Sequence, residues 1–279
     1  MSDLAEKRRL LLETITGYGS CAVAFSGGVD SAVVAQAAQM ALGSRAVAVT
    51  GVSDSLAAGE LPAARELARR IGIRHVELET KELDEPAYVA NAADRCYHCK
   101  TELYTQLASR REVLGVTTIV NGANADDAGD YRPGMRAAAE RAVRSPLAEC
   151  GITKAEVRQL AAEWDLPVAD KPASPCLASR IAYGEEVTPQ RLEMIDRAEQ
   201  LIRQLGLVNV RVRYHRGDLA RIEVPAAAIA ELADETVRTG LAAGLKDLGF
   251  RFVTLDLEGF RSGSLNHLIP VEVLMHSAR

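Results

Sequence analysis

The sequence predicts an α/β protein: a parallel, doubly wound sheet followed by a smaller C-terminal α+β domain. Over about 120 residues, short apolar runs alternate with helical stretches, which is typical of a parallel sheet with helices on both faces. After Tyr183-Gly184 the order becomes helix, strand, strand, helix, strand. A chain of 279 residues is long for one compact core, so we expect two domains, 1–186 and 187–279.

Each element of the first domain has its own signal. Apolar runs predict strands at 21–25, 45–52, 75–78 and 116–120, and amphipathic patterns predict helices at 1–15, 31–42, 56–71, 101–114 and 154–163. The rest of 126–186 is expected to be loop. In the second domain Thr188-Pro189 looks like an N-cap with proline at the first helical position. It predicts a helix through 205, then strands at 208–214 and 219–224, a helix to 248 and a strand at 252–255.

Composition excludes several classes of protein. A net charge of -5 provides no large positive field, so nucleic acid is not the expected partner. No apolar run approaches the length of a membrane span, and the N-terminus lacks the pattern of a secretory signal. We therefore expect a cytoplasmic protein without a membrane partner. Its five cysteines are too few for a disulfide scaffold and suit metal ligands, nucleophiles or core residues.

A glycine-rich loop follows the first predicted strand. Ser26, Gly27, Gly28, Asp30 and Ser31 belong to the segment Ser-Gly-Gly-Val-Asp-Ser. The glycines let backbone N–H groups approach an anion, and the following helix adds its positive N-terminal end. The loop has no lysine and is not a Walker loop, and GxGxxG is absent. It resembles the phosphate loop of the ATP-pyrophosphatase (PP-loop) superfamily, which passes AMP from ATP to a substrate oxygen.

Other candidate ATP-binding residues follow the predicted strands. Ligands of parallel sheets lie beyond the C-terminal ends of the strands, where Thr50 and Asp126 are expected. Asp30 suits Mg²⁺ or a helix cap, and Asp126 suits Mg²⁺ or a solvated loop or cap. Arg132 is a candidate for the ATP phosphates or for pairing with a glutamate.

Three cysteines form a second group of candidates. Cys96 and Cys99 have C-x-x-C spacing, and Cys176 lies between Lys171 and Arg180 in a proline-stiffened loop. Cationic neighbours favour a thiolate, so Cys176 is a plausible nucleophile. Lys171 and Arg180 are also candidate ATP-binding residues. Three thiolates suit a [4Fe–4S] cluster with one iron left open. The alternative is an accidental pair with Cys176 as a small core residue.

Several segments together resemble one family over almost the whole chain. They are Cys96-Tyr97-His98-Cys99-Lys100, Asn121 through Asp127, Asp130 through Gly134, Lys171 through Arg180, and Val210 through His215. These segments are similar to the LarE family, the ATP-dependent sulfur transferases that mature the nickel-pincer nucleotide of lactate racemase. The resemblance implies a pyridinium-3,5-dicarboxylate mononucleotide as substrate, ATP and Mg²⁺ as requirements, and a symmetric homo-oligomer.

The resemblance also implies roles for the candidate residues. Cys176 would either give up its own sulfur or ligate a [4Fe–4S] cluster with Cys96 and Cys99, and both sources remain open. Arg211 and Arg213 lie two apart on a predicted strand and share one face, where paired guanidinium groups suit the substrate phosphate. A solvated strand face with ion pairs is the alternative. Glu199 and Glu223 are possible carboxylate partners there by resemblance.

Two other functions remain open. A tRNA thiolase would use the same loop, but it should carry a basic surface for RNA, and this chain is acidic. A non-catalytic adenine-nucleotide-binding protein would need neither a charged loop around Cys176 nor a second domain.

Overall fold

The computed structural model describes residues 3–129, 133–172 and 174–261. It divides into two compact units, which we describe separately. The first unit consists of Met1–Ser53, Ala58–Glu82 and Cys96–Ser174, and the second of Asp54–Ala57, Leu83–Arg95 and Pro175–Arg279. The domain boundary between 186 and 187 stays a prediction. Among the described residues, none of the helices combines the length and hydrophobicity needed to span a bilayer.

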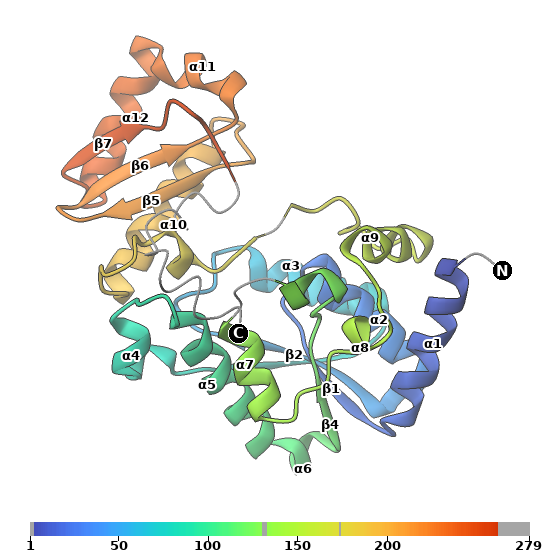
Figure 1. The fold of residues 1–279 in the computed structure, drawn as a ribbon. Coiled ribbons are helices and arrows are strands. Elements are labelled where there is room, and N and C mark those ends of the chain that lie inside the picture. The colour runs from blue at the N-terminus through green and yellow to red at the C-terminus, as the bar shows by residue number, and fades with distance from the viewer. Residues whose placement is uncertain (1–2, 130–132, 173, 262–279) are drawn as a thin grey trace. The chain divides into compact units, whose positions relative to one another are not determined.

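The first unit is built on a parallel sheet of four strands in the order β3-β2-β1-β4 (Figure 1). The strands are β1 Cys21–Ala24, β2 Ala46–Val52, β3 Arg74–Glu79 and β4 Thr118–Val120. β2 and β3 are added on one side of β1, and β4 is added on the other side, so the order of the strands reverses beside β1. In sheets of this kind ligands bind beyond the carboxyl ends of the strands at such a reversal. The predicted fold class is confirmed.

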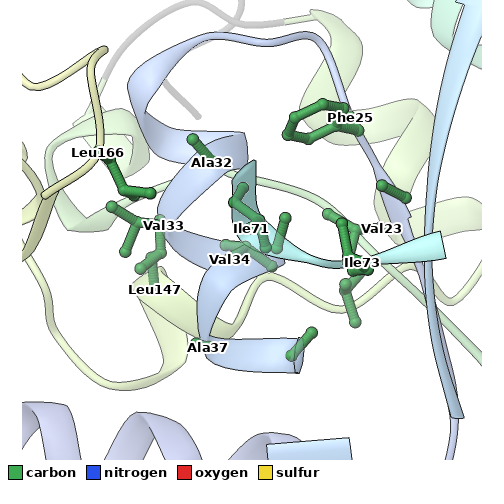
Figure 2. Packing of buried hydrophobic residues seen from close by; sticks show 14 of the residues in the cluster. Val23, Phe25, Ala32, Val33, Val34, Ala37, Ile71, Ile73, Leu147 and Leu166 are labelled. Carbon is green, nitrogen blue, oxygen red and sulfur yellow. The ribbon is translucent and has the colours of Figure 1, made fainter. Parts of the chain in front are cut away.

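Helices cover both faces of this sheet, and the strands send alternate residues into two cores. Cys21 and Val23 pack with α1, α2, α3 and α9, whereas Ala22 packs with α5 and α7. This alternation follows from the pleat of a strand. Figure 2 shows the first core around α2, with Val23 below Phe25. The helices are α1 Asp3–Gly17, α2 Val29–Leu42, α3 Glu60–Ile71, α5 Arg95–Ser109, α6 Arg111–Leu114, α7 Pro133–Glu140, α8 Pro146–Glu149 and α9 Lys154–Glu163, with 3₁₀ turns at Gly43–Arg45, Glu82–Asp84 and Ala125–Gly129.

Most predicted elements are present, with shifted ends. The helix predicted from residue 31 begins at Val29, because Gly28 already has the extended backbone of an N-cap. The helix expected over 101–114 begins six residues earlier and is split by Arg110. The helix predicted at 154–163 is α9, and the part of 126–186 expected to be loop contains the helices α7 and α8.

The second unit has a mixed three-stranded sheet in the order β5-β6-β7. β5 and β6 are antiparallel, β6 and β7 are parallel, and α10 and α12 pack against the outer strands. The elements are α4 Pro86–Val89, a 3₁₀ turn at Leu177–Arg180, α10 Pro189–Arg203, β5 Arg211–His215, β6 Leu219–Glu223, a 3₁₀ turn at Ala226–Ala228, α11 Ile229–Ala233, α12 Glu235–Asp247 and β7 Phe252–Leu255. The additional small α+β part is as predicted.

Asn91 and Arg95 tie an early segment of the chain into the second unit. The buried Asn91 amide donates to the carbonyls of Ile181, Ala182 and Glu185 at 3.3, 2.9 and 2.9 Å. Asn91 also accepts from Arg95, whose guanidinium donates to the Ala178 carbonyl at 2.8 Å. Asn91 has φ +53, a left-handed conformation that asparagine tolerates better than most residues. These bonds fix the main chain of 178–185.

A close contact between main chains shapes the carboxyl end of the first sheet. Gly122 follows β4, and a Cβ atom there would lie 2.8 Å from Ser31 N and 3.0 Å from Asp30 C. Only glycine leaves room for this approach. The loop after β4 therefore lies directly against the first turn of α2.

We expect Gly122→Ala to lower the free energy of unfolding by about 1–3 kcal/mol, because the added Cβ meets main-chain atoms that cannot rotate away. Nucleotide affinity should fall as well, since the first turn of α2 must shift. Urea unfolding and Mg-ATP titration measure the two effects. Gly17→Ala is the control, because nothing lies within 4 Å of its added Cβ. Equal behaviour of the two variants would contradict this account.

Candidate active site

The phosphate loop, residues 26–31, is folded as an anion-binding turn. Gly27 has φ +71, and Gly28 is the N-cap of α2 without a side-chain cap. The first helical hydrogen bond runs from Ala32 N–H to Gly28 O, so the preceding N–H groups have no helical acceptor. Ser31 Oγ accepts from Ser26 N–H at 3.2 Å and donates to Gly28 O at 3.0 Å, which holds the turn. The helix N-terminus is thus shaped to receive phosphate oxygens.

Thr50 supports the loop from inside. Its buried hydroxyl donates to the Phe25 carbonyl at 2.8 Å, one residue before the loop begins. Because that hydroxyl has a single proton, the 2.8 Å contact with His75 Nε2 requires the imidazole to donate. Burial lowers the pKa of His75, which keeps the ring neutral. The role of Thr50 in binding ATP stays a prediction, and its direct contact is with the residue that precedes the loop.

Asp30 is held by two side chains that the sequence did not single out. Asn124 Nδ2 donates to Asp30 Oδ1 at 3.0 Å, and Lys154 Nζ forms an ion pair with Asp30 Oδ2. Asn124 follows β4, and Lys154 is the first residue of α9. Lys154 lies 124 residues after Asp30, and no local sequence pattern predicts that the two side chains meet. The structure therefore adds an amide and an ammonium group to the predicted phosphate site.

The acidic pair after β4 is part of the same network. Asp126 Oδ2 accepts from Lys154 N–H at 2.8 Å, so this carboxylate caps the first turn of α9. Asp127 Oδ2 accepts from Asn124 N–H at 3.0 Å. Mg²⁺ usually takes one or two protein carboxylates and fills its remaining positions with water and phosphate oxygens. Asp30 is paired with Lys154 and Asn124, and Asp126 caps α9, so a role in holding Mg²⁺ stays a prediction for both carboxylates.

Lys171 lies in the first unit with the first turn of α3. Its ammonium contacts Glu60 Oε2 at 2.8 Å, and Ser174 Oγ donates to Glu60 Oε1 at 2.8 Å. Glu60 therefore fixes the segment that leads out of this unit. Arg132, another predicted ATP-binding residue, lies outside the described residues.

Cys96 and Cys99 lie in the first two turns of α5, three residues apart and so on one face of the helix. Cys96 is exposed and Cys99 is half-buried. This donor pair suits two thiolate ligands of an iron–sulfur cluster. Cys176, the third predicted ligand, belongs to the second unit. Within either unit, the described residues bring together no group of three His, Cys, Asp or Glu side chains suited to a metal.

The Cys176 loop, residues 175–180, is held through its main chain. The buried Arg180 donates to the carbonyls of Pro175 and Cys176, the latter at 2.9 Å. Ser179 Oγ donates to the same Cys176 carbonyl at 2.7 Å, and Leu177 N–H donates to Ser55 O at 2.8 Å. The Cys176 side chain remains partly exposed. The main chain of the loop is thus held by several hydrogen bonds, and its thiol is partly accessible.

Arg180 is paired with a buried carboxylate in the second unit. Arg180 Nε lies 3.0 Å from Glu199 Oε1, with the two side chains 1% and 0% exposed. Glu199 Oε2 also contacts Arg203 at 2.6 Å. The predicted ATP-binding role of Arg180 stays a prediction. In the structure Arg180 connects α10, through Glu199, to the main chain of the Cys176 loop.

Arg211 and Arg213 share one face of β5, as strand alternation predicts, and both are buried. Arg213 donates to Glu223 Oε2 at 3.0 and 2.8 Å and to the Ser179 carbonyl at 3.2 Å. Burial, aided by repulsion from Arg180, lowers the pKa of Arg211 to about 10. The guanidinium of Arg211 lies 5.4 Å from the Phe260 ring centroid. In this cluster Arg213 is paired with Glu223 and Arg180 with Glu199, so much of the positive charge is balanced. Binding of the substrate phosphate by Arg211 and Arg213 stays a prediction.

Comparisons with known proteins agree with this site. The family profile described as asparagine synthase matches residues 16–120, which include the phosphate loop. A protein of Lactiplantibacillus plantarum named pyridinium-3,5-bisthiocarboxylic acid mononucleotide synthase is 36% identical over 95% of this chain and 96% of its own length. This chain belongs to the LarE family. It is an ATP-dependent sulfur transferase of the PP-loop type.

Two further relatives of this LarE-family chain differ in how much of their length it matches. An uncharacterised protein of Synechocystis is 47% identical over 88% of this chain and 92% of its own length. The tRNA-specific 2-thiouridylase MnmA of Xanthobacter autotrophicus is 30% identical over 80% of this chain and 69% of its own length. The relative named as a mononucleotide synthase is thus matched more completely than the thiouridylase.

We expect Glu199→Gln to destabilise the protein by about 3–5 kcal/mol, because it leaves the buried Arg180 without its counter-charge. Urea unfolding measures the loss. Glu193→Gln is the matched control on the same helix, since Glu193 pairs with Arg197 at 3.5 Å while both are largely exposed. The control should change stability by less than about 1 kcal/mol. Similar losses in both variants would contradict the role given to burial.

Protonation of His75 should weaken the first unit. The folded state lowers the pKa of His75 below its ordinary value of 6.5, so the unfolded chain binds the proton more readily. Stability should therefore be lost as the pH falls through about 6.5. Urea unfolding of wild type and His75→Gln from about pH 7.5 to 5 tests this. The difference in free energy of unfolding between the two proteins should be constant above about pH 7 and should change in favour of the variant at lower pH. If the free energies of unfolding of both proteins depend on pH in the same way, the assignment to His75 is contradicted.

Proposed function

We propose that this chain uses ATP to adenylylate the carboxylates of pyridinium-3,5-biscarboxylic acid mononucleotide and converts them to thiocarboxylates. The observation that carries this proposal is the likeness to the named synthase over nearly the whole of both chains. The phosphate loop, with its uncapped helix N-terminus, supports the use of ATP. We also expect the working protein to be a homo-oligomer.

The first proposed step activates the carboxylate. A carboxylate oxygen is a poor leaving group, so it attacks the α-phosphorus of ATP, forming an acyl-adenylate and releasing pyrophosphate. The N–H groups of the loop and Ser31 would bind the phosphates, and Asp30 would hold Mg²⁺, which would neutralise phosphate charge. Thr50 and Asp126 fix the backbone around this site.

The second proposed step moves sulfur. Cys176 thiolate attacks the acyl carbon, its sulfur forms a thioester, and the bond to AMP breaks. In the form with a sacrificed cysteine, a base removes the Cα proton of Cys176 and the Cβ–S bond breaks. The substrate then keeps sulfur as a thiocarboxylate, and the chain keeps dehydroalanine. Arg211 and Arg213 are proposed to hold the substrate phosphate.

An iron–sulfur form is the alternative source of sulfur. Cys96, Cys99 and Cys176 would hold a [4Fe–4S] cluster, and an extra sulfide bound to its open iron would be the donor in place of the cysteine sulfur. The spacing of Cys96 and Cys99 on α5 supports this form. The chain would then turn over repeatedly with external sulfide refilling the open iron after each transfer, whereas the sacrificial form acts once per sulfur.

A tRNA thiolase is the second candidate, supported by the likeness to the thiouridylase. The net charge of -5 weighs against it, because tRNA binding depends on a positive surface. Salt-sensitive binding of tRNA with sulfur transfer to it would favour this candidate.

The deciding measurement is the mass of the Cys176 peptide after anaerobic turnover with Mg-ATP and the mononucleotide. Product together with loss of the elements of H₂S from Cys176 identifies the cysteine as donor. Product with an intact Cys176 identifies the cluster sulfide instead, and Cys96→Ala should then abolish turnover. Cys150→Ala, which removes a buried thiol outside the proposed site, is the control and should keep activity. Folded protein that releases neither product nor AMP would overturn the proposed function.

A further inference from the structure

Lys154 is fixed at its main chain beside the phosphate loop. It is the first residue of α9, whose N-cap Thr153 and third helical residue Glu156 form a capping box. The Lys154 N–H donates to Asp126 at 2.8 Å. α9 also packs against α2, the helix that the phosphate loop opens. Two independent sets of bonds therefore determine where the Lys154 side chain begins.

The Lys154 ammonium contacts the acidic residue of the phosphate loop. It pairs with Asp30 Oδ2, while Asn124 donates to the other carboxylate oxygen at 3.0 Å. The Lys154 side chain is 40% exposed and that of Asp30 is 26% exposed. A pair exposed to this degree is only weakly stabilising, so exchanging its partners costs little. A ligand that offers better partners can separate it.

ATP and Mg²⁺ offer such partners. Asp30 is a hard oxygen ligand of the kind that Mg²⁺ prefers, and a lysine ammonium binds phosphate oxygens as a point charge. The phosphate loop itself contains no lysine, although the terminal phosphates of ATP carry most of its negative charge. Without a cation, Asp30 would repel those phosphates. Lys154 is the ammonium that the structure places against that carboxylate.

We propose that Lys154 binds the pyrophosphate end of ATP, and that it is held on Asp30 until Mg²⁺ takes over that carboxylate. This inference rests on the proposed function, since it assigns a residue to the ATP site. The ion pair keeps Asp30 neutralised before ATP arrives. When the magnesium complex binds, Lys154 leaves Asp30 and contacts a phosphate oxygen.

The proposal predicts that removing the Lys154 ammonium changes the affinities for metal and for pyrophosphate in opposite directions. A metal ion alone competes with the ammonium for Asp30, so removing the ammonium should strengthen metal binding. Pyrophosphate needs the ammonium, so the same change should weaken pyrophosphate binding. A residue that only supports the loop would affect both in the same direction.

The test compares wild type, Lys154→Gln and Lys154→Arg. Titration calorimetry measures the affinity for pyrophosphate in excess Mg²⁺, and electron paramagnetic resonance measures the affinity for Mn²⁺ alone. For Lys154→Gln we expect pyrophosphate binding to weaken by about tenfold or more, in line with loss of a charge-assisted bond. Mn²⁺ should bind several-fold more tightly, because a loss of the competing ammonium leaves Asp30 to the metal. Lys154→Arg keeps the charge and should restore most of the pyrophosphate affinity.

Arg8→Gln is the matched control, because Arg8 pairs with Glu163 at the other end of the same helix at 3.1 Å. It should leave both affinities close to those of wild type. Unchanged pyrophosphate affinity in Lys154→Gln, or weakening of both ligands together, would overturn the inference alone. Wild-type protein that binds neither Mg-pyrophosphate nor Mg-ATP would instead overturn the proposed function, and this inference with it.

Discussion

The contact between Gly122 and the first turn of α2 is the constraint on which the candidate site depends. A Cβ at this position would come within 2.8 Å of Ser31 N, so the loop after β4 lies against the phosphate loop without a side chain between them. That approach brings Asn124 to Asp30 and allows Asp126 to cap α9. The start of α9 then places Lys154 on Asp30. Three segments that are distant in sequence, the phosphate loop, the loop after β4 and the start of α9, are thus assembled around one main-chain contact.

The two units use charge in different ways. In the first unit the Lys154–Asp30 pair is partly exposed and weakly held, which suits groups that exchange partners with a ligand. In the second unit Arg180 and Glu199 are almost fully buried, and separating them leaves an uncompensated charge in a medium of low dielectric. The first arrangement can respond to ligands. The second holds the Cys176 loop in one conformation.

Local signals in the sequence predicted the fold well, and long-range contacts explain the rest. The helix at 154–163 was predicted to the residue, and Thr153 and Glu156 form a capping box at its start. Alternation on β5 placed Arg211 and Arg213 on one face, but their burial against Glu223 depends on pairing with β6. No local pattern reveals the Lys154–Asp30 pair, because it joins two helix starts across the fold. The early start of α5 was missed because its first two turns carry two cysteines and a histidine, which are weak helix formers.

The clamp made by Asn91 has a consequence for how the chain is synthesised. Its side chain meets the Ile181 carbonyl across 90 residues of sequence, and those residues include most of the C-terminal half of the first unit. On the ribosome, the segment that carries Asn91 emerges long before its acceptors, and it must wait unpaired while the parallel sheet is completed. The native contacts of 178–185 can therefore form only after the C-terminal part of the first unit has been synthesised. A fragment that begins after Asn91 would lack the amide that holds the carbonyls of Ile181, Ala182 and Glu185.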